Sequence, residues 1–108
     1  MRMLAVSTPT KTVDLIGAPT DVGAAHRGAS MGPEAMRVAG IQQTLAQFGV
    51  SVNDLGNLAG PPNPWLPPVD GYRHLPEVQA WNQAVHDAVY GSLSGGRLPI
   101  LLGGDHCL

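Results

Sequence analysis

An imidazole and a carboxylate follow an apolar run in the stretch "ILLGGDHCL", residues 100–108. Gly103 and Gly104 come first and let backbone segments approach closely, and Asp105 and His106 follow directly. The imidazole of His106 could bind a metal while an acceptor fixes its second ring nitrogen, act as a general base, or be a hydrogen-bonded core residue. One histidine and one cysteine do not match the ligand spacing of a zinc site, so further metal ligands must come from elsewhere.

Cys107 adjoins His106, which raises the question of a cysteine–histidine nucleophile pair. Successive side chains on a strand point to opposite faces, so we expect these two to diverge and discount the pair. Cys107 is also the only cysteine and can form no internal disulfide. This favours a reducing, cytoplasmic setting.

Three other histidines have structural interpretations. His86 is expected on the solvated side of a helix, and His74 is expected as a cap or turn residue just before that helix. His26 lies beside Arg27 in a glycine-rich loop, where a substrate or interface role is open. Trp81 falls in the apolar register of the helix and is expected in the core.

Two loops invite comparison with phosphate-binding motifs. "GAAHRGAS", residues 23–30, nearly fits a P-loop, but Ala29 stands where the lysine that contacts the phosphates should be. "IGAPTDVG", residues 16–23, lacks the second glycine of a dinucleotide-binding fingerprint. We therefore expect no nucleoside triphosphate, nicotinamide or flavin.

The elements that would position these residues alternate between strand and helix. Residues 12–19 predict a first strand, ended by a glycine and a proline. A helix is expected from Pro33 to the stop at Gly49. Its apolar face would be formed by Val38, Ile41, Leu45 and Phe48. Residues 50–56 predict a second strand.

A proline-rich segment, residues 57–75, interrupts the pattern and can be neither a helix nor an inner strand. We favour an ordered surface loop, pinned by Trp65 and Tyr72, over a disordered linker, because aromatic residues are scarce in linkers. A helix from Pro76 to Gly95 or Gly96 follows, and then a third, buried-type strand in "RLPILLGGDH", residues 97–106. The order β-α-β-loop-α-β predicts an α/β fold with a parallel sheet, whose ligands gather at the carboxyl ends of the strands.

Composition limits the possible partners. The 108 residues carry a net charge of −2 and no basic stripe, so we expect no nucleic-acid partner. No apolar run is long enough for a membrane span, and the N-terminal apolar stretch is too short for a secretory signal. Charged residues make up 13%, about half the usual share, which suits either a part of something larger or a chain rich in alanine and glycine.

Three segments in order resemble the N-terminal part of arginases, in the ureohydrolase family: "VDLIGAPTDVG", "HRGASMGPEAMRVAG" and "ILLGGDHCL". The resemblance covers residues 12–108, after an N-terminal tail of residues 1–11. It implies a three-layer α/β/α fold with a central parallel sheet, in which the first strand lies between the second and the third. It also implies a homo-oligomer.

The resemblance further implies hydrolysis of L-arginine to L-ornithine and urea, by a hydroxide that bridges two Mn²⁺ ions. His106 would be a ligand of one ion, and Asp105, Gly103 and Gly104 would be supporting or structural residues. The family's other ligands come from D-A-H-x-D and S-x-D-x-D-x-x-D-P motifs, which this sequence lacks. Family chains are roughly three times as long, so we expect residues 12–108 to be the N-terminal portion of one domain, inactive and marginally folded alone.

Two alternatives stay open at this point. The first is another ureohydrolase, such as an agmatinase or another guanidino hydrolase. The second is a non-enzymatic truncated remnant or a small α/β binding module.

Overall fold

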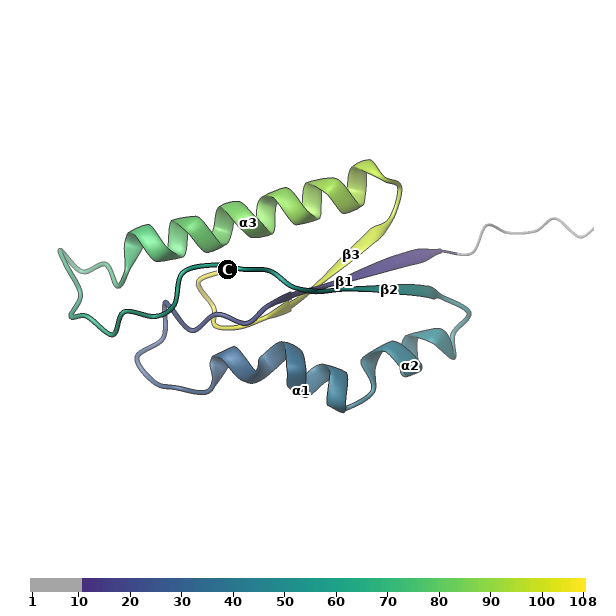
Figure 1. The fold of residues 1–108 in the computed structure, drawn as a ribbon, viewed down its shortest axis with the longest axis horizontal. Helices are drawn as coiled ribbons and strands as arrows, with labels where there is room; N and C mark the ends of the chain where they lie inside the picture. The colour runs from purple at the N-terminus through teal and green to yellow at the C-terminus, as the bar shows by residue number, and fades with distance from the viewer. Residues whose placement is uncertain (1–10) are drawn as a thin grey trace, which may run out of the picture.

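The computed structural model describes residues 11–108, in which strands and helices alternate (Figure 1). The tail expected over residues 1–11 lies, apart from Lys11, outside the described residues. The elements are β1 (Thr12–Ala18), a 3-10 turn (Ala29–Met31), α1 (Gly32–Val38), α2 (Ile41–Ala46), β2 (Ser51–Asn57), α3 (Leu75–Ser94) and β3 (Leu98–Gly103).

All three strands are parallel and form one sheet in the order β2-β1-β3. Val13 of β1 lies opposite Val52 on one side and Leu98 on the other. In Figure 1, α3 covers one face of the sheet, and α1 and α2 lie on the other. The predicted α/β fold and the position of the first strand between the other two are confirmed.

Strand β1 is the centre of the core because its alternate side chains enter two different hydrophobic clusters. Val13 and Leu15 pack with Leu102 of β3 on the α2 side. Ala18 packs with Trp81 of α3 on the opposite side. Since neighbouring strands cover both edges of β1, nearly all of this strand is buried.

The single helix predicted between Pro33 and Gly49 is wrong. Gly40 adopts a left-handed conformation with φ 93°, which ends α1 before α2 begins. Because the helix direction changes at Gly40, the residues predicted to share one apolar face no longer do so. Ile41 packs against the core, whereas Val38 and Phe48 are 81% and 79% exposed.

A buried carboxylate ties β1 to the turn between α3 and β3. Asp14 is fully buried, and one of its oxygens accepts a hydrogen bond of 2.6 Å from Nε of Arg97. The other oxygen accepts one of 3.3 Å from the Asn53 amide on β2. Burial by itself raises the pKa of the Asp14 carboxyl, but the hydrogen bonds, that of Arg97 first, outweigh burial and lower this pKa below its ordinary value.

The proline-rich segment, residues 58–74 between β2 and α3, is a loop with a defined path. Asp70 and Gly71 both have positive φ and form a tight turn, closed by two hydrogen bonds between Val69 and Tyr72. Such a turn suits the Asp-Gly sequence, because both central residues of a type I′ turn need positive φ.

Trp65 and Tyr72 hold this loop less than expected, because they are 40% and 61% exposed. Trp65 contacts Arg27 of the loop after β1, but neither ring enters the core. The indole N–H of Trp81 instead donates to the Pro61 carbonyl over 2.8 Å, and the Asn63 amide donates to the Asp21 carbonyl over 2.7 Å. Partly buried hydrogen bonds at the loop's base therefore hold it, since each polar group would lose its partner if the loop detached.

Within residues 11–108, no helix combines the length and apolarity needed to cross a bilayer.

Candidate functional site

The site begins where β3 ends. The strand stops at Gly103 rather than running on to His106, so the predicted strand over residues 97–106 is too long at both ends. Residues 104–107 bend away and run beside the extension of β1. The amide of Gly104 donates to the Ala18 carbonyl over 3.3 Å, and that of Asp105 donates to the Thr20 carbonyl over 3.0 Å.

Gly103 and Gly104 have different surroundings. A Cβ on Gly104 would lie 2.6 Å from the carbonyl oxygens of both Ala18 and Thr20. A Cβ on Gly103 would meet only the end of the Leu108 side chain, at 3.5 Å. The close backbone approach therefore needs glycine at position 104, and position 103 has room for a methyl group.

The Asp105 carboxylate joins this turn to the loop that follows β1. One oxygen accepts the Gly23 amide over 2.8 Å, across 82 residues of sequence. The other accepts the Cys107 amide, also over 2.8 Å. A Cβ on Gly23 would lie 2.8 Å from Cβ of Cys107, so the two loops meet where only glycine fits.

His106 itself is exposed, although it follows the partly buried strand β3. The third strand is less buried than its apolar sequence suggested, because only Leu102 in it is fully enclosed. Within the described part of the chain, no three His, Cys, Asp or Glu side chains come close enough to hold a metal ion. His106 is thus a single exposed imidazole just beyond the carboxyl end of β3, in a turn whose backbone is held by the Asp105 carboxylate.

Cys107 is half-buried and packs against the cluster around Trp81. Burial, and then the neighbouring Asp105 carboxylate, raise the pKa of its thiol to about 11, so it is protonated near neutral pH. His106 is exposed while Cys107 is not. Both residues lie in a turn and not on a strand, so the strand alternation on which the prediction rested does not apply here.

The remaining histidines lie apart from this turn. His26 is exposed in the first loop, and its neighbour Arg27 stacks on Trp65, with 5.1 Å between the guanidinium carbon and the ring centroid. His86 is exposed, as expected, and lies 3.2 Å from the Asp87 carboxylate.

His74 holds the cap position of α3, but its ring makes no capping hydrogen bond. It is buried, with 7% of its surface exposed. Its ring contacts Val22 and Leu66 instead. No local sequence signal predicts this role, because Val22 lies 52 residues away along the chain.

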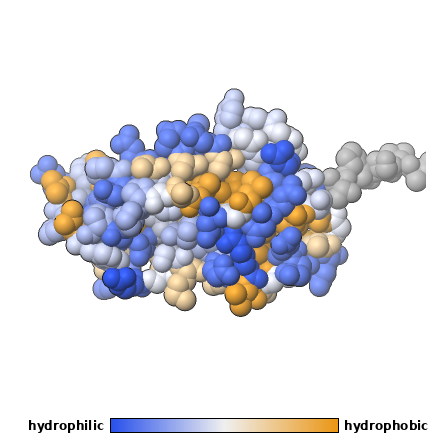
Figure 2. Space-filling view, in the orientation of Figure 1, coloured by the Kyte–Doolittle hydropathy of each residue, from blue (hydrophilic) through white to orange (hydrophobic). Residues whose placement is uncertain are grey.

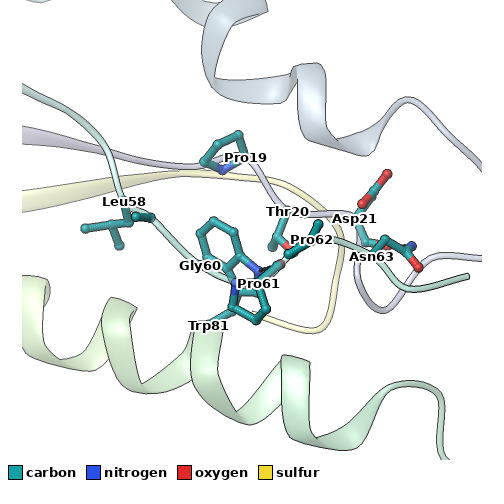
Figure 3. A pocket seen from close by; sticks show the side chains of 10 residues that line it. Pro19, Thr20, Asp21, Leu58, Gly60, Pro61, Pro62, Asn63 and Trp81 are labelled. Carbon is teal, nitrogen blue, oxygen red and sulfur yellow. Dashed lines mark hydrogen bonds between the residues drawn. The ribbon is translucent and has the colours of Figure 1, made fainter.

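A cavity of about 300 Å³ lies near the carboxyl ends of β1 and β2. Figure 3 shows Trp81 reaching from α3 toward Gly60 and Pro61, with Asp21 and Asn63 at the far end. A second, mostly apolar cavity of about 580 Å³ lies within the loop of residues 58–74 and the start of α3. Neither cavity is lined by Asp105 or His106.

Comparison with known proteins gives one consistent result. The sequence model of the arginase family matches residues 11–108. The chain is 33% identical over 98 residues to an arginase of Brevibacillus brevis, covering 91% of this chain and 33% of that protein. It is 38% identical over 95 residues to an arginase of Brucella melitensis, covering 87% and 31%.

Solved structures agree with the sequence matches. The native structure of arginase from Bacillus caldovelox superposes with a TM-score of 0.81 at 35% identity, over 90% of this chain and 33% of that one. Arginase from Bacillus subtilis gives 0.76 at 34% identity, over 90% and 30%. The chain spans about a third of the length of the curated relatives that it matches. Since the match extends over 98 of its 108 residues and includes the turn at His106, this chain belongs to the arginase family.

Proposed function

We propose that residues 12–108 are the N-terminal portion of a single arginase-like domain that hydrolyses L-arginine to L-ornithine and urea. His106 is its ligand for one Mn²⁺ ion of a pair. The observation that carries the proposal is the position of His106, at the carboxyl end of β3 in a chain that matches arginases over residues 11–108. The proposal includes a small guanidino substrate, a homo-oligomeric assembly and a cytoplasmic setting.

The residues present fit a metal site in part. An exposed imidazole is a suitable nitrogen ligand for a divalent transition metal. Each oxygen of the Asp105 carboxylate accepts a hydrogen bond from a backbone amide, so Asp105 fits a supporting role better than that of a metal ligand. One ligand does not make a site, and we therefore propose that the 108-residue chain alone releases no urea.

In this proposal, residues of the turn after β3 position the metal ligand His106. Gly104 and Asp105 hold the turn against the backbone that follows β1, so His106 leaves the sheet at a fixed point. Bound Mn²⁺ would supply Lewis acidity and lower the pKa of water. Because the turn is held by hydrogen bonds to the backbone, it needs little reorganisation when a ligand arrives.

The test is a chimera in which these residues replace the matching third of Bacillus caldovelox arginase. We expect the chimera to release urea from L-arginine with Mn²⁺, faster than it hydrolyses agmatine. His106→Ala should lower both the Mn²⁺ content and the activity. The unmodified 108-residue chain, assayed alongside, should give no urea.

His86→Ala is the matched control, because it removes an exposed histidine from the outer side of α3. It should leave the Mn²⁺ content and kcat unchanged. A His106→Ala chimera with full Mn²⁺ content and full activity would contradict the assignment of the ligand. A folded chimera that prefers agmatine would contradict the assignment of the substrate.

A further inference from the structure

We propose that His74 is a positioning residue for His106, acting through a single peptide group, the one that joins Val22 to Gly23. This inference rests on the proposed role of His106 as a metal ligand. His74 lies at the start of α3, and nothing in its local sequence connects it with the turn after β3.

The first step is the contact between His74 and Val22. Nδ1 of His74 lies 2.6 Å from the Val22 carbonyl oxygen. A carbonyl can only accept, so Nδ1 carries the proton and donates. On the other side of the ring, Nε2 lies 3.0 Å from the Leu66 amide nitrogen and 3.1 Å from the Leu66 carbonyl oxygen. The donor toward Val22 is Nδ1 whichever of these two contacts Nε2 makes.

The second step is that the Val22 carbonyl and the Gly23 amide belong to one planar peptide group. The Gly23 amide donates to the Asp105 carboxylate over 2.8 Å. Because the group is rigid and trans, its carbonyl and amide ends point in opposite directions and rotate together. His74 therefore holds one end and Asp105 the other, and a hydrogen bond at the carbonyl also strengthens the one at the amide.

The third step leads to His106. Asp105 directly precedes it, and the second Asp105 oxygen accepts the amide of Cys107, which directly follows it. The backbone on both sides of His106 is thereby fixed by one carboxylate. A change at His74 reaches this carboxylate through the Val22–Gly23 peptide group, without any direct contact between His74 and His106.

Burial and backbone strain support this role. His74 is 7% exposed and Val22 is 1% exposed, so water cannot easily replace the contact between them. His74 also has φ 52° and ψ 45°, a left-handed conformation that is uncommon for residues other than glycine. Such a conformation persists where the surroundings hold the residue in place.

Two variants of His74 distinguish its hydrogen bond to Val22 from its contact with Leu66. His74→Asn puts an amide N–H near the position of Nδ1, keeps a donor for Val22 and tolerates positive φ. His74→Gln puts its amide near the position of Nε2, keeps the side toward Leu66 and withdraws the donor from Val22. His74→Asn should also be the more stable variant, so a role confined to stability is recognised by exchange that accelerates equally throughout the fold, including the central strand β1.

The measurement is amide hydrogen exchange, followed by mass spectrometry, on the chimera with Bacillus caldovelox arginase, for the peptides that contain Gly23 and Cys107 against those of the central strand β1. We expect His74→Gln to accelerate Gly23 and Cys107 exchange about tenfold relative to β1. His74→Asn should restore both to within about threefold of the unsubstituted chimera. Unchanged Gly23 exchange in His74→Gln would overturn the proposal, and so would equal acceleration of Gly23 and the β1 amides.

A second readout concerns His106 itself, with Mn²⁺ alone as the probe and the metal-free chimera as the protein, because one ligand does not make a site. The apparent Kd for Mn²⁺, measured by titration, should rise in His74→Gln and return in His74→Asn. An Mn²⁺ affinity that is the same in all three chimeras would overturn the positioning role. An Mn²⁺ affinity that is unchanged by His106→Ala would instead count against the proposed metal ligand, and the exchange data would still test the hydrogen-bond connection.

Discussion

At the scale of single residues, the adjacent glycines of the turn are not equivalent. Gly104 lies against two carbonyl oxygens of the backbone that follows β1, whereas Gly103 faces only a side-chain end. Backbone atoms cannot move aside as a flexible side chain can. The requirement for glycine is therefore a property of position 104, and the sequence "GG" does not reveal it.

We expect Gly104→Ala to lower the free energy of unfolding by about 2 kcal/mol, because its methyl group would force the turn away from the backbone of Ala18 and Thr20. Urea denaturation followed by circular dichroism measures this change. Gly103→Ala is the matched control and should stay within about 0.5 kcal/mol of the original chain. Equal losses in the two variants would show that the turn does not approach the backbone as closely as described.

At the scale of elements, two ion pairs join parts of the fold that are distant in sequence. Arg97 links the turn before β3 to the fully buried Asp14 of β1. Arg37 of α1 reaches Asp54 of β2 over 2.8 Å, at a partly exposed site. The buried pair matters more, because Asp14 without its partner would be a charge with no access to water.

We expect Arg97→Met to cost about 3 kcal/mol at pH 7 and Arg37→Met, the comparison variant, about 1 kcal/mol. Denaturant unfolding of both variants alongside the original chain gives the values. If the two losses were equal, the fully buried position of Asp14 would not be what makes its pair important.

The contribution of Asp14 to the pH dependence of stability should change sign in Arg97→Met. In the original chain the folded-state pKa of Asp14 lies below the ordinary 3.8, so its stabilisation is present above that value and is lost as the pH falls through the folded-state pKa. In Arg97→Met, burial dominates and raises the pKa, so stability falls as the pH rises through it. Unfolding curves between about pH 3 and pH 6 would show the reversal.

At the scale of the whole molecule, the sheet leaves apolar residues uncovered. In Figure 2, hydrophobic residues gather between the two helical layers of the molecule. On the edge strands, Leu55 of β2 is 56% exposed and Leu98 of β3 is 46% exposed. Strand β2 carries a charged residue, Asp54, and a shift in its register against β1, which both discourage edge pairing. Strand β3 has no charge, and Pro99 removes only one backbone donor from it.

We therefore expect the 108-residue chain to self-associate through β3. Sedimentation velocity should give a mass that rises with concentration, and Leu98→Lys should return the chain to the monomer because lysine at an edge opposes pairing. Leu55→Lys on the opposite edge is the control and should change the mass little. A monomeric original chain at all concentrations would contradict this expectation.

The sequence by itself determined the order of strands and helices, because apolar periodicity and the glycines and prolines that end each element act over a few residues. The same local signals identified the three segments that resemble arginases, but they carried the third strand on to His106, whereas it stops at Gly103. They failed at Gly40, where one glycine in a left-handed conformation divided a helix that periodicity had predicted as continuous.

Only the tertiary structure decided how the turn at His106 is held. The Asp105–Gly23 and His74–Val22 contacts join residues 82 and 52 positions apart. Each depends on the path of the whole chain, since parallel strands bring distant loops to the same edge of the sheet. Local patterns can name the histidine that leaves the sheet, but the groups that fix its direction come together only when the sheet and its helices have packed.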